Sequence, residues 1–156
     1  MATIAIRAVR EASEYPQLVE IWRSSVAATH DFLAESDRVD IEQRLVSDYF
    51  PQVSLLVAER DGRPVGFAGV VEGSLEMLFV KADMRGTGMG SALLEHAMDE
   101  FGVRSLDVNE QNSQAVEFYR HQGFEVVGRS EVDDQGRPYP LLHMRVPAVR
   151  ADARRR

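Results

Sequence analysis

The sequence of 156 residues contains no cysteine, which excludes several classes of chemistry. Disulfide frameworks, thiolate-ligated zinc or iron–sulfur sites and cysteine nucleophiles all need a thiol. Long apolar runs are also missing, because no stretch reaches the roughly 18 apolar residues of a membrane-spanning helix. The first ten residues lack the apolar core of a signal peptide. We therefore expect a soluble, cytoplasmic protein with no membrane partner.

Positive charge is scarce outside the C-terminal tail. The whole chain carries a net charge of −7, and residues 150–156 carry four arginines and one aspartate, so the chain before them carries −10. An acidic body repels the phosphates of nucleic acids and attracts cations, so we expect no nucleic-acid partner. The length favours one domain. We assign it to residues 1–147 and expect residues 148–156 to form a basic, disordered tail.

Hydrophobic spacing predicts a strand and two helices in the first third of the chain. Polar and apolar residues alternate at residues 4–8, and apolar residues then recur every three or four positions as far as Val26. These periods indicate a half-buried strand and an amphipathic helix. A second helix is expected from Ser36 or Asp37 until Pro51 ends it. Its buried face would contain Ile41, Leu45, Val46 and Tyr49.

The remaining chain predicts six strands and two helices. Segments rich in strand-forming residues lie at 54–59, 65–71 and 75–80, separated by turn signals at Asp61-Gly62 and Gly73-Ser74. Further strands are expected at 104–108, 124–132 and 139–146, with helices from Ser91 and over 113–122. The resulting order is βααβββαβαββ. It describes a single mixed α/β domain whose sheet is mostly antiparallel and contains one β-α-β crossover.

Glycines at positions 86, 88 and 90 lie between a predicted strand and a predicted helix. Such a turn can point successive N–H groups outward, and the positive end of the following helix then favours a pyrophosphate. Arg85 could add a contact to phosphate. Alternatively, the glycines only form a strained connection. Other phosphate motifs fit less well, since no lysine follows Gly90 and Ser91 stands where a dinucleotide-binding fingerprint needs glycine.

Two segments resemble the signatures of the GNAT N-acetyltransferase family. Residues 85–90, Arg-Gly-Thr-Gly-Met-Gly, are similar to its acetyl-CoA motif Arg/Gln-x-x-Gly-x-Gly/Ala. Residues 112–124 are similar to its second block, Asn-x-x-Ala-x-x-Phe-Tyr-x-x-x-Gly-Phe. The order and spacing of the blocks and the predicted element order match the family fold. Within the family, residues 28–33 and 130–142 resemble the small bacterial YjaB-like branch.

The resemblance implies that acetyl-CoA binds where the fourth and fifth strands diverge. Backbone groups near Phe79 and Val80 would hold the pantetheine arm, and the glycine-rich turn would hold the pyrophosphate. Asn112 would contact the pantetheine or cap its helix. The cofactor-binding residues implied by the resemblance are Phe79, Val80, Arg85, Gly86, Thr87, Gly88, Met89, Gly90, Ser91 and Asn112.

The resemblance also implies direct transfer of the acetyl group to a primary amine of a small molecule or peptide, with Tyr119 as the general acid. Without the resemblance, its helix spacing favours a core position for Tyr119 over a catalytic one. The amine needs a base or a water relay to remove its proton. Strand alternation places Glu76 on the face of Leu78 and Val80, where its pKa could be raised, although an exposed strand glutamate is the alternative.

Three residues are expected near the acceptor amine. His30 is a rival base or a substrate contact, unless it is only a loop histidine, and Phe32 follows it in the same loop. Tyr139 lies in a hairpin that borders the acceptor site in this family.

No histidine pair has the spacing of metal ligands, so we expect no metal. A non-catalytic acyl-CoA-binding regulatory module and a nicotinamide-dependent enzyme are the competing functions. The acceptor is left open, as is the choice between a monomer and a homodimer.

Overall fold

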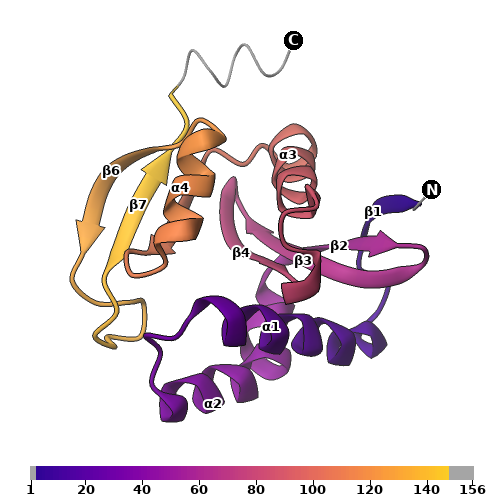
Figure 1. The fold of residues 1–156 in the computed structure, drawn as a ribbon, viewed down its shortest axis with the longest axis horizontal. Helices are drawn as coiled ribbons and strands as arrows, with labels where there is room; N and C mark the ends of the chain where they lie inside the picture. The colour runs from indigo at the N-terminus through magenta and orange to yellow at the C-terminus, as the bar shows by residue number, and fades with distance from the viewer. Residues whose placement is uncertain (1–2, 148–156) are drawn as a thin grey trace.

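A computed structural model describes residues 3–147 of the chain (Figure 1). Its element order confirms the predicted βααβββαβαββ. The basic tail predicted at residues 148–156 lies outside the described residues. The elements are β1 (Ile4–Ala8), α1 (Tyr15–Thr29), α2 (Glu35–Arg44), β2 (Ser54–Arg60), β3 (Arg63–Val71), β4 (Ser74–Val80), α3 (Met89–Phe101), β5 (Ser105–Asn109), α4 (Ser113–His121), β6 (Glu125–Ser130) and β7 (Leu141–Arg145).

The described strands form one sheet in the order β1-β2-β3-β4-β5-β7-β6. Neighbouring strands run antiparallel except β4 and β5, which are parallel. These two strands pair only at Ser74–Ser105 and Leu75–Leu106. Beyond those pairs they separate, so the centre of the sheet contains the divergence that was predicted for the fourth and fifth strands.

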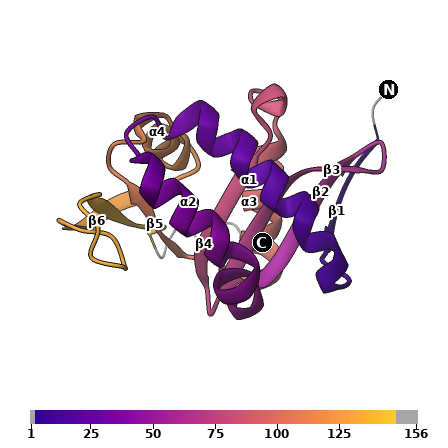
Figure 2. The ribbon, with the colours of Figure 1, turned by 90° about the horizontal axis from the view of Figure 1, so that it is seen from below.

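Helices cover both faces of the sheet. Figures 1 and 2 show α1 and α2 on one face and α3 and α4 on the other. Helix α1 packs against β3 and β4, α3 packs against β2, β3 and β4, and α4 packs against β5. Two apolar cores result. One lies under α3 and α4 and includes Leu93 and Leu94, and the other lies under α1 and includes Ile21 and Trp22.

The two halves of the sheet differ in burial. Strands β2 and β3 are buried on both faces over most of their length. In β5, buried Leu106 and Val108 alternate with exposed Asp107. This alternation marks a sheet with one open face. Figure 2 accordingly shows β6 lying to one side of α1 and α2.

One part of the predicted second helix is wrong. The α-helix starts at Glu35, and residues 45–49 continue as a π-helix. Leu45 is buried as predicted, but Val46 is 44% exposed. The prediction assumed a period of 3.6 residues, whereas a π-helix bonds residue i to i+5 and therefore changes the direction of its side chains.

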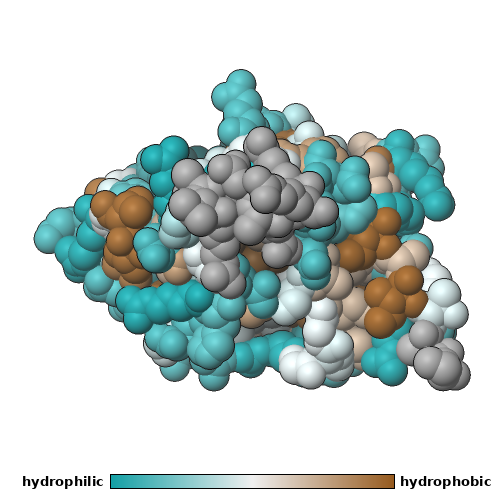
Figure 3. All heavy atoms as spheres, turned by 90° about the horizontal axis from the view of Figure 1, so that it is seen from above, coloured by the Kyte–Doolittle hydropathy of each residue, from teal (hydrophilic) through white to brown (hydrophobic). Residues whose placement is uncertain are grey.

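The face of the molecule seen from above is mostly polar. Figure 3 shows hydrophobic residues as small patches separated by hydrophilic ones. Two exposed valines, Val126 and Val127, are neighbours on the edge strand β6. No helix within residues 3–147 is long and apolar enough to cross a membrane.

Candidate active site

The glycine-rich turn leads directly into helix α3. Gly86 has φ +77° and Gly88 has φ +87°, values that L side chains rarely adopt. Gly88 is the N-cap residue, and no described side chain caps the helix, so the first-turn N–H groups remain available for a ligand. Gly90 lacks a positive φ; a Cβ added there would lie 3.6 Å from Phe118 Cζ. Two glycines therefore shape the turn, whereas a Cβ at the third would make only an ordinary contact.

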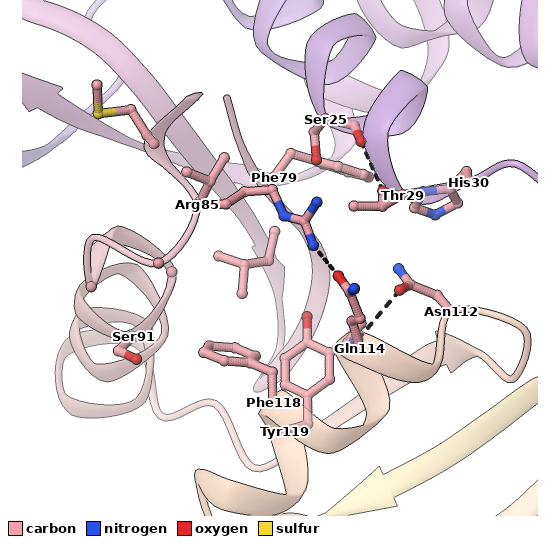
Figure 4. A pocket seen from close by; sticks show the side chains of 17 residues that line it. Ser25, Thr29, His30, Phe79, Arg85, Ser91, Asn112, Gln114, Phe118 and Tyr119 are labelled. Atoms are coloured by element: carbon pink, nitrogen blue, oxygen red, sulfur yellow. Dashed lines mark hydrogen bonds between the residues drawn. The ribbon is translucent and has the colours of Figure 1, made fainter. Parts of the chain in front are cut away.

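A cavity of about 390 Å³ lies beside this turn (Figure 4). Its walls come from α1, β4, the turn and α4. Most of the predicted cofactor-binding residues line it, namely Phe79, Val80, Arg85, Gly86, Gly88, Gly90, Ser91 and Asn112. Thr87 and Met89 do not. The Thr87 hydroxyl donates to the Met84 carbonyl, and Met89 is buried in the core under α3.

Two polar contacts connect the walls of this cavity to α4. The exposed Arg85 side chain donates to the Gln114 side-chain oxygen, so the turn and α4 are joined across the cavity (Figure 4). Asn112 Oδ1 accepts from the Ala115 N–H at 3.3 Å. The cap role predicted for Asn112 is therefore confirmed, and its contact with a cofactor stays a prediction.

Tyr119 is both a core residue and a cavity residue. Its side chain is 8% exposed and packs against Phe118 and Phe124, with ring centroids 5.2 Å and 6.0 Å away. Figure 4 shows its hydroxyl pointing into the cavity. The hydroxyl has no hydrogen-bond partner within residues 3–147. Burial raises the pKa of the phenol, so Tyr119 keeps its proton at neutral pH.

A second cavity of about 140 Å³ lies at the gap between β4 and β5. It shares His30, Phe79 and Tyr119 with the first cavity and adds Glu76 and Asp107. Because the shared residues include Tyr119, its side chain lies where the two cavities meet. We call the larger space the turn cavity and the smaller one the gap cavity.

The alternation predicted for Glu76 is wrong because β4 contains a bulge. Met77 pairs with Gly69 and Leu75 pairs with Val70, which leaves Glu76 as an extra residue. As a result, Leu75 and Leu78 pack in the same core although they are three residues apart. Glu76 is an exposed strand residue, as the alternative held. Partial desolvation nevertheless raises the pKa of its carboxyl, and the nearby charges of Asp134 and Asp107 raise it further. A bond from the Ser74 hydroxyl opposes this shift.

His30 ends helix α1 and faces both cavities. The Thr29 hydroxyl donates to the Ser25 carbonyl at 2.8 Å and lies 2.7 Å from His30 Nδ1. Because that hydroxyl has only one proton, Nδ1 carries the hydrogen of this contact and Nε2 is left as an acceptor. Burial lowers the pKa of His30 to about 4. The ring is therefore neutral at pH 7 and a weak base.

The two other predicted acceptor contacts line neither cavity. Tyr139 donates its hydroxyl proton to Asp37 and accepts from the Ala34 N–H at 3.0 Å. The Phe32 ring lies 6.1 Å from the Tyr139 ring and 5.1 Å from the His30 ring. These contacts hold the loop after α1 against the connection between β6 and β7.

Sequence reasoning missed several lining residues, including Ser25, Thr29, Gln114 and Phe118. Ser25 gave a weak signal, because it is a hydroxyl on the apolar stripe of α1. Gln114 and Thr29 gave none. Among the described residues, no group of three or more His, Cys, Asp or Glu is arranged to hold a metal ion.

This fold and site define an acyltransferase of the GNAT class. A family profile described as an acetyltransferase (GNAT) domain matches residues 26–146, and the chain belongs to that family. It is 49% identical over 135 residues to the peptidyl-lysine N-acetyltransferase YjaB of Salmonella typhimurium, covering 86% of this chain and 92% of that protein. It is 48% identical over 143 residues to YjaB of Escherichia coli, covering 90% and 95%.

The likeness extends to a solved structure. The solution structure of the apo form of E. coli YjaB superposes with a TM-score of 0.82 at 46% identity, covering 92% of this chain and 97% of the other. The predicted family, its YjaB-like branch and its fold are therefore confirmed, and the chain is an N-acetyltransferase.

Proposed function

We propose that this enzyme acetylates the ε-amino group of lysine in peptides or proteins, with acetyl-CoA as the donor. The observation that carries the proposal is the unpartnered hydroxyl of the largely buried residue Tyr119, at the meeting point of the two cavities. Two related proteins named peptidyl-lysine N-acetyltransferase support the choice of acceptor. Because acetyl-CoA is an intracellular metabolite, the proposed reaction takes place in the cytoplasm.

The turn cavity fits acetyl-CoA by its donor groups. Gly86 and Gly88 bend the turn, and the uncapped first turn of α3 offers N–H groups and a positive helix end to a pyrophosphate. The gap side of β4 beyond Leu75 has no strand partner within residues 3–147, so its backbone can pair with the amides of a pantetheine arm. Arg85 adds a positive charge at the same cavity.

The side chains around the meeting point suit a direct transfer. Acetyl-CoA supplies an activated acetyl thioester. Glu76, whose pKa is raised, removes the proton of the incoming ammonium group so that the neutral amine can form the new C–N bond. Tyr119, whose pKa is also raised, donates its proton to the sulfur as the C–S bond breaks, and the proton that the attacking nitrogen then loses restores the phenol. His30 is a weaker candidate for the base, because its pKa of about 4 disfavours proton uptake.

The test replaces the proposed acid while keeping its ring. Tyr119→Phe should lower kcat for a blocked lysine peptide by about 10²-fold, the usual scale of general acid catalysis. The KM for acetyl-CoA and the melting temperature should change little, since the hydroxyl has no partner in the described residues. CoA release and thermal unfolding measure the three quantities. Unchanged kcat would refute the assigned role, and acetyl-CoA binding without turnover in the wild type would instead favour a regulatory acyl-CoA-binding module.

A further inference from the structure

The gap cavity is acidic. Glu76 and Asp107 line it, and Asp134 is close enough for its charge to act on Glu76. No arginine or lysine is among the described residues that line this cavity. Its negative charge is therefore not compensated by a lining cation.

Arginines on the adjoining segments are bound elsewhere. Arg137, three residues after Asp134, contacts Asp37, Asp40 and Asp133. On β6, Arg129 contacts Glu110 at 2.8 Å and Glu131 at 3.2 Å. Asp134 itself has no ion pair within residues 3–147. A cation that enters the gap cavity thus meets carboxylates that these two arginines do not neutralise.

Asp107 is held in place by His143 of β7, and His143 is held in turn by Ser130 of β6. Its Oδ1 lies 2.6 Å from His143 Nδ1, and His143 Nε2 lies 2.7 Å from the Ser130 hydroxyl. A carboxylate only accepts, so His143 Nδ1 carries a proton and donates it to Asp107, while Nε2 pairs with the Ser130 hydroxyl. Oδ2 of Asp107 has no partner in the described part of the chain. This chain of contacts fixes Asp107 and leaves one oxygen for a ligand.

The order Ser130–His143–Asp107 matches that of hydrolase triads, but its position favours a different role. Ser130 lines neither cavity, whereas Asp107 lines the gap cavity. Of these three residues, Asp107 is therefore the one whose side chain can contact a ligand in the gap cavity. Ser130 and His143 are positioning residues that act through Asp107.

A second feature indicates that a ligand reaches these carboxylates. Tyr119 is 8% exposed, its hydroxyl has no partner within residues 3–147, and it also lines the gap cavity. Among the described residues, Arg7 Nε is the buried side-chain nitrogen or oxygen without a partner, so the Tyr119 hydroxyl is open to the cavities and a ligand group can reach it. The acidic residues thus border the place where the proposed amine and thioester meet.

We infer that the preferred acceptor is a lysine flanked by a second basic residue, whose positive charge is bound by Asp107 and Asp134 beside the reactive amine. This inference rests on the proposed function and names the class of lysine that it selects. A peptide with an acidic neighbour would bring like charges together and bind less well.

The kinetic test uses two short peptides with a blocked N-terminus and a single lysine, flanked by arginine in one and by glutamate in the other. Wild-type enzyme should show a kcat/KM roughly fivefold or more higher for the arginine peptide, the scale of partly exposed ion pairs. Asp107→Asn and Asp134→Asn should each reduce this preference, with the KM for the arginine peptide rising more than the KM for the glutamate peptide. Asp48→Asn is the matched control, because Asp48 is exposed and lines neither cavity.

The positioning role of His143 is tested in the same assay. His143→Leu should weaken the preference as Asp107→Asn does, again through KM. His143→Asn should restore much of it, because an amide N–H can still donate to Asp107. Equal losses for the leucine and asparagine variants would overturn the positioning role.

Calorimetric titration of the same peptides in the presence of CoA separates this inference from the proposed function. Tighter binding of the arginine peptide without acetylation would contradict the function and support the inference. Acetylation of both peptides with equal kcat/KM would overturn the inference and support the function. A preference that Asp107→Asn, Asp134→Asn and Asp48→Asn reduce equally would also overturn it. If neither acetylation nor charge-dependent binding is observed, both the proposed function and this inference are contradicted.

Discussion

The two halves of the sheet differ in how deeply their strands are buried. Strands β2 and β3 lie between α1 and α3 and are buried on both faces. Strands β5 and β7 have buried apolar residues and more exposed polar ones such as Asp107 and His143, and β6 has no buried residue. The first half therefore provides most of the apolar core, and the second presents accessible polar side chains. The candidate site lies where the halves meet, between β4 and β5.

The largest expected effect tests the core of the first half. Phe67 is 0% exposed, and its ring centroid lies 5.6 Å from those of both Phe50 and Phe79. Phe67→Ala should lower the free energy of unfolding by about 3–5 kcal/mol because it leaves a cavity among these rings. Chemical denaturation measures the loss. Val127→Ala, at a site 63% exposed on β6, should change stability by less than about 0.5 kcal/mol. Similar losses in both variants would break the comparison.

The order of the elements was predictable because its signals are local. Alternation at residues 4–8 and the turn at Asp61-Gly62 each depend on a few neighbouring residues. Gly62 indeed has φ +80° at that turn. The bulge at Glu76 and the π-helix at residues 45–49 were not predictable, since both depend on packing against distant segments.

The candidate site divides in the same way. The glycine-rich turn and Tyr119 were predicted because each belongs to a contiguous motif. The contact between Arg85 and Gln114 joins residues 29 positions apart. The contact between Asp107 and His143 joins residues 36 positions apart. No periodicity or motif encodes such pairs, so only the folded chain reveals them.

A smaller effect is expected where an arginine connects the two halves. Arg137, in the connection between β6 and β7, lies 3.5 Å from Asp37 and also contacts Asp40 of α2, and its side chain is 14% exposed. Arg137→Ala should lower the free energy of unfolding by about 1–3 kcal/mol, because Asp37 loses its charged donor and Asp40 keeps only Arg44. Thermal and chemical unfolding measure the loss. Arg137→Lys should recover part of it, and a loss below about 0.5 kcal/mol would show that the halves hold together without this contact.

The smallest expected effect is a shift in the pH profile of kcat/KM, caused by Glu76 where the two halves of the sheet meet. A base must be deprotonated, so a raised pKa at Glu76 makes kcat/KM fall at a higher pH on acidification than an ordinary glutamate would. Asp134→Asn removes the nearby charge that raises this pKa most. The acid limb of the kcat/KM profile should then move to lower pH. If the acid limb does not move in Asp134→Asn, or if it persists in Glu76→Gln, it reports the titration of another group.

The short pairing between β4 and β5 links ligand binding to the cohesion of the whole fold. Only Ser74–Ser105 and Leu75–Leu106 join the two parts of the sheet. Backbone amides along this seam should exchange their hydrogens with solvent sooner than those within β3, which has a partner on each side. A donor that pairs with the free edge of β4 would slow this exchange and raise the melting temperature by mass action. The two parts of the sheet would then unfold more cooperatively in the donor-bound enzyme than in the free enzyme.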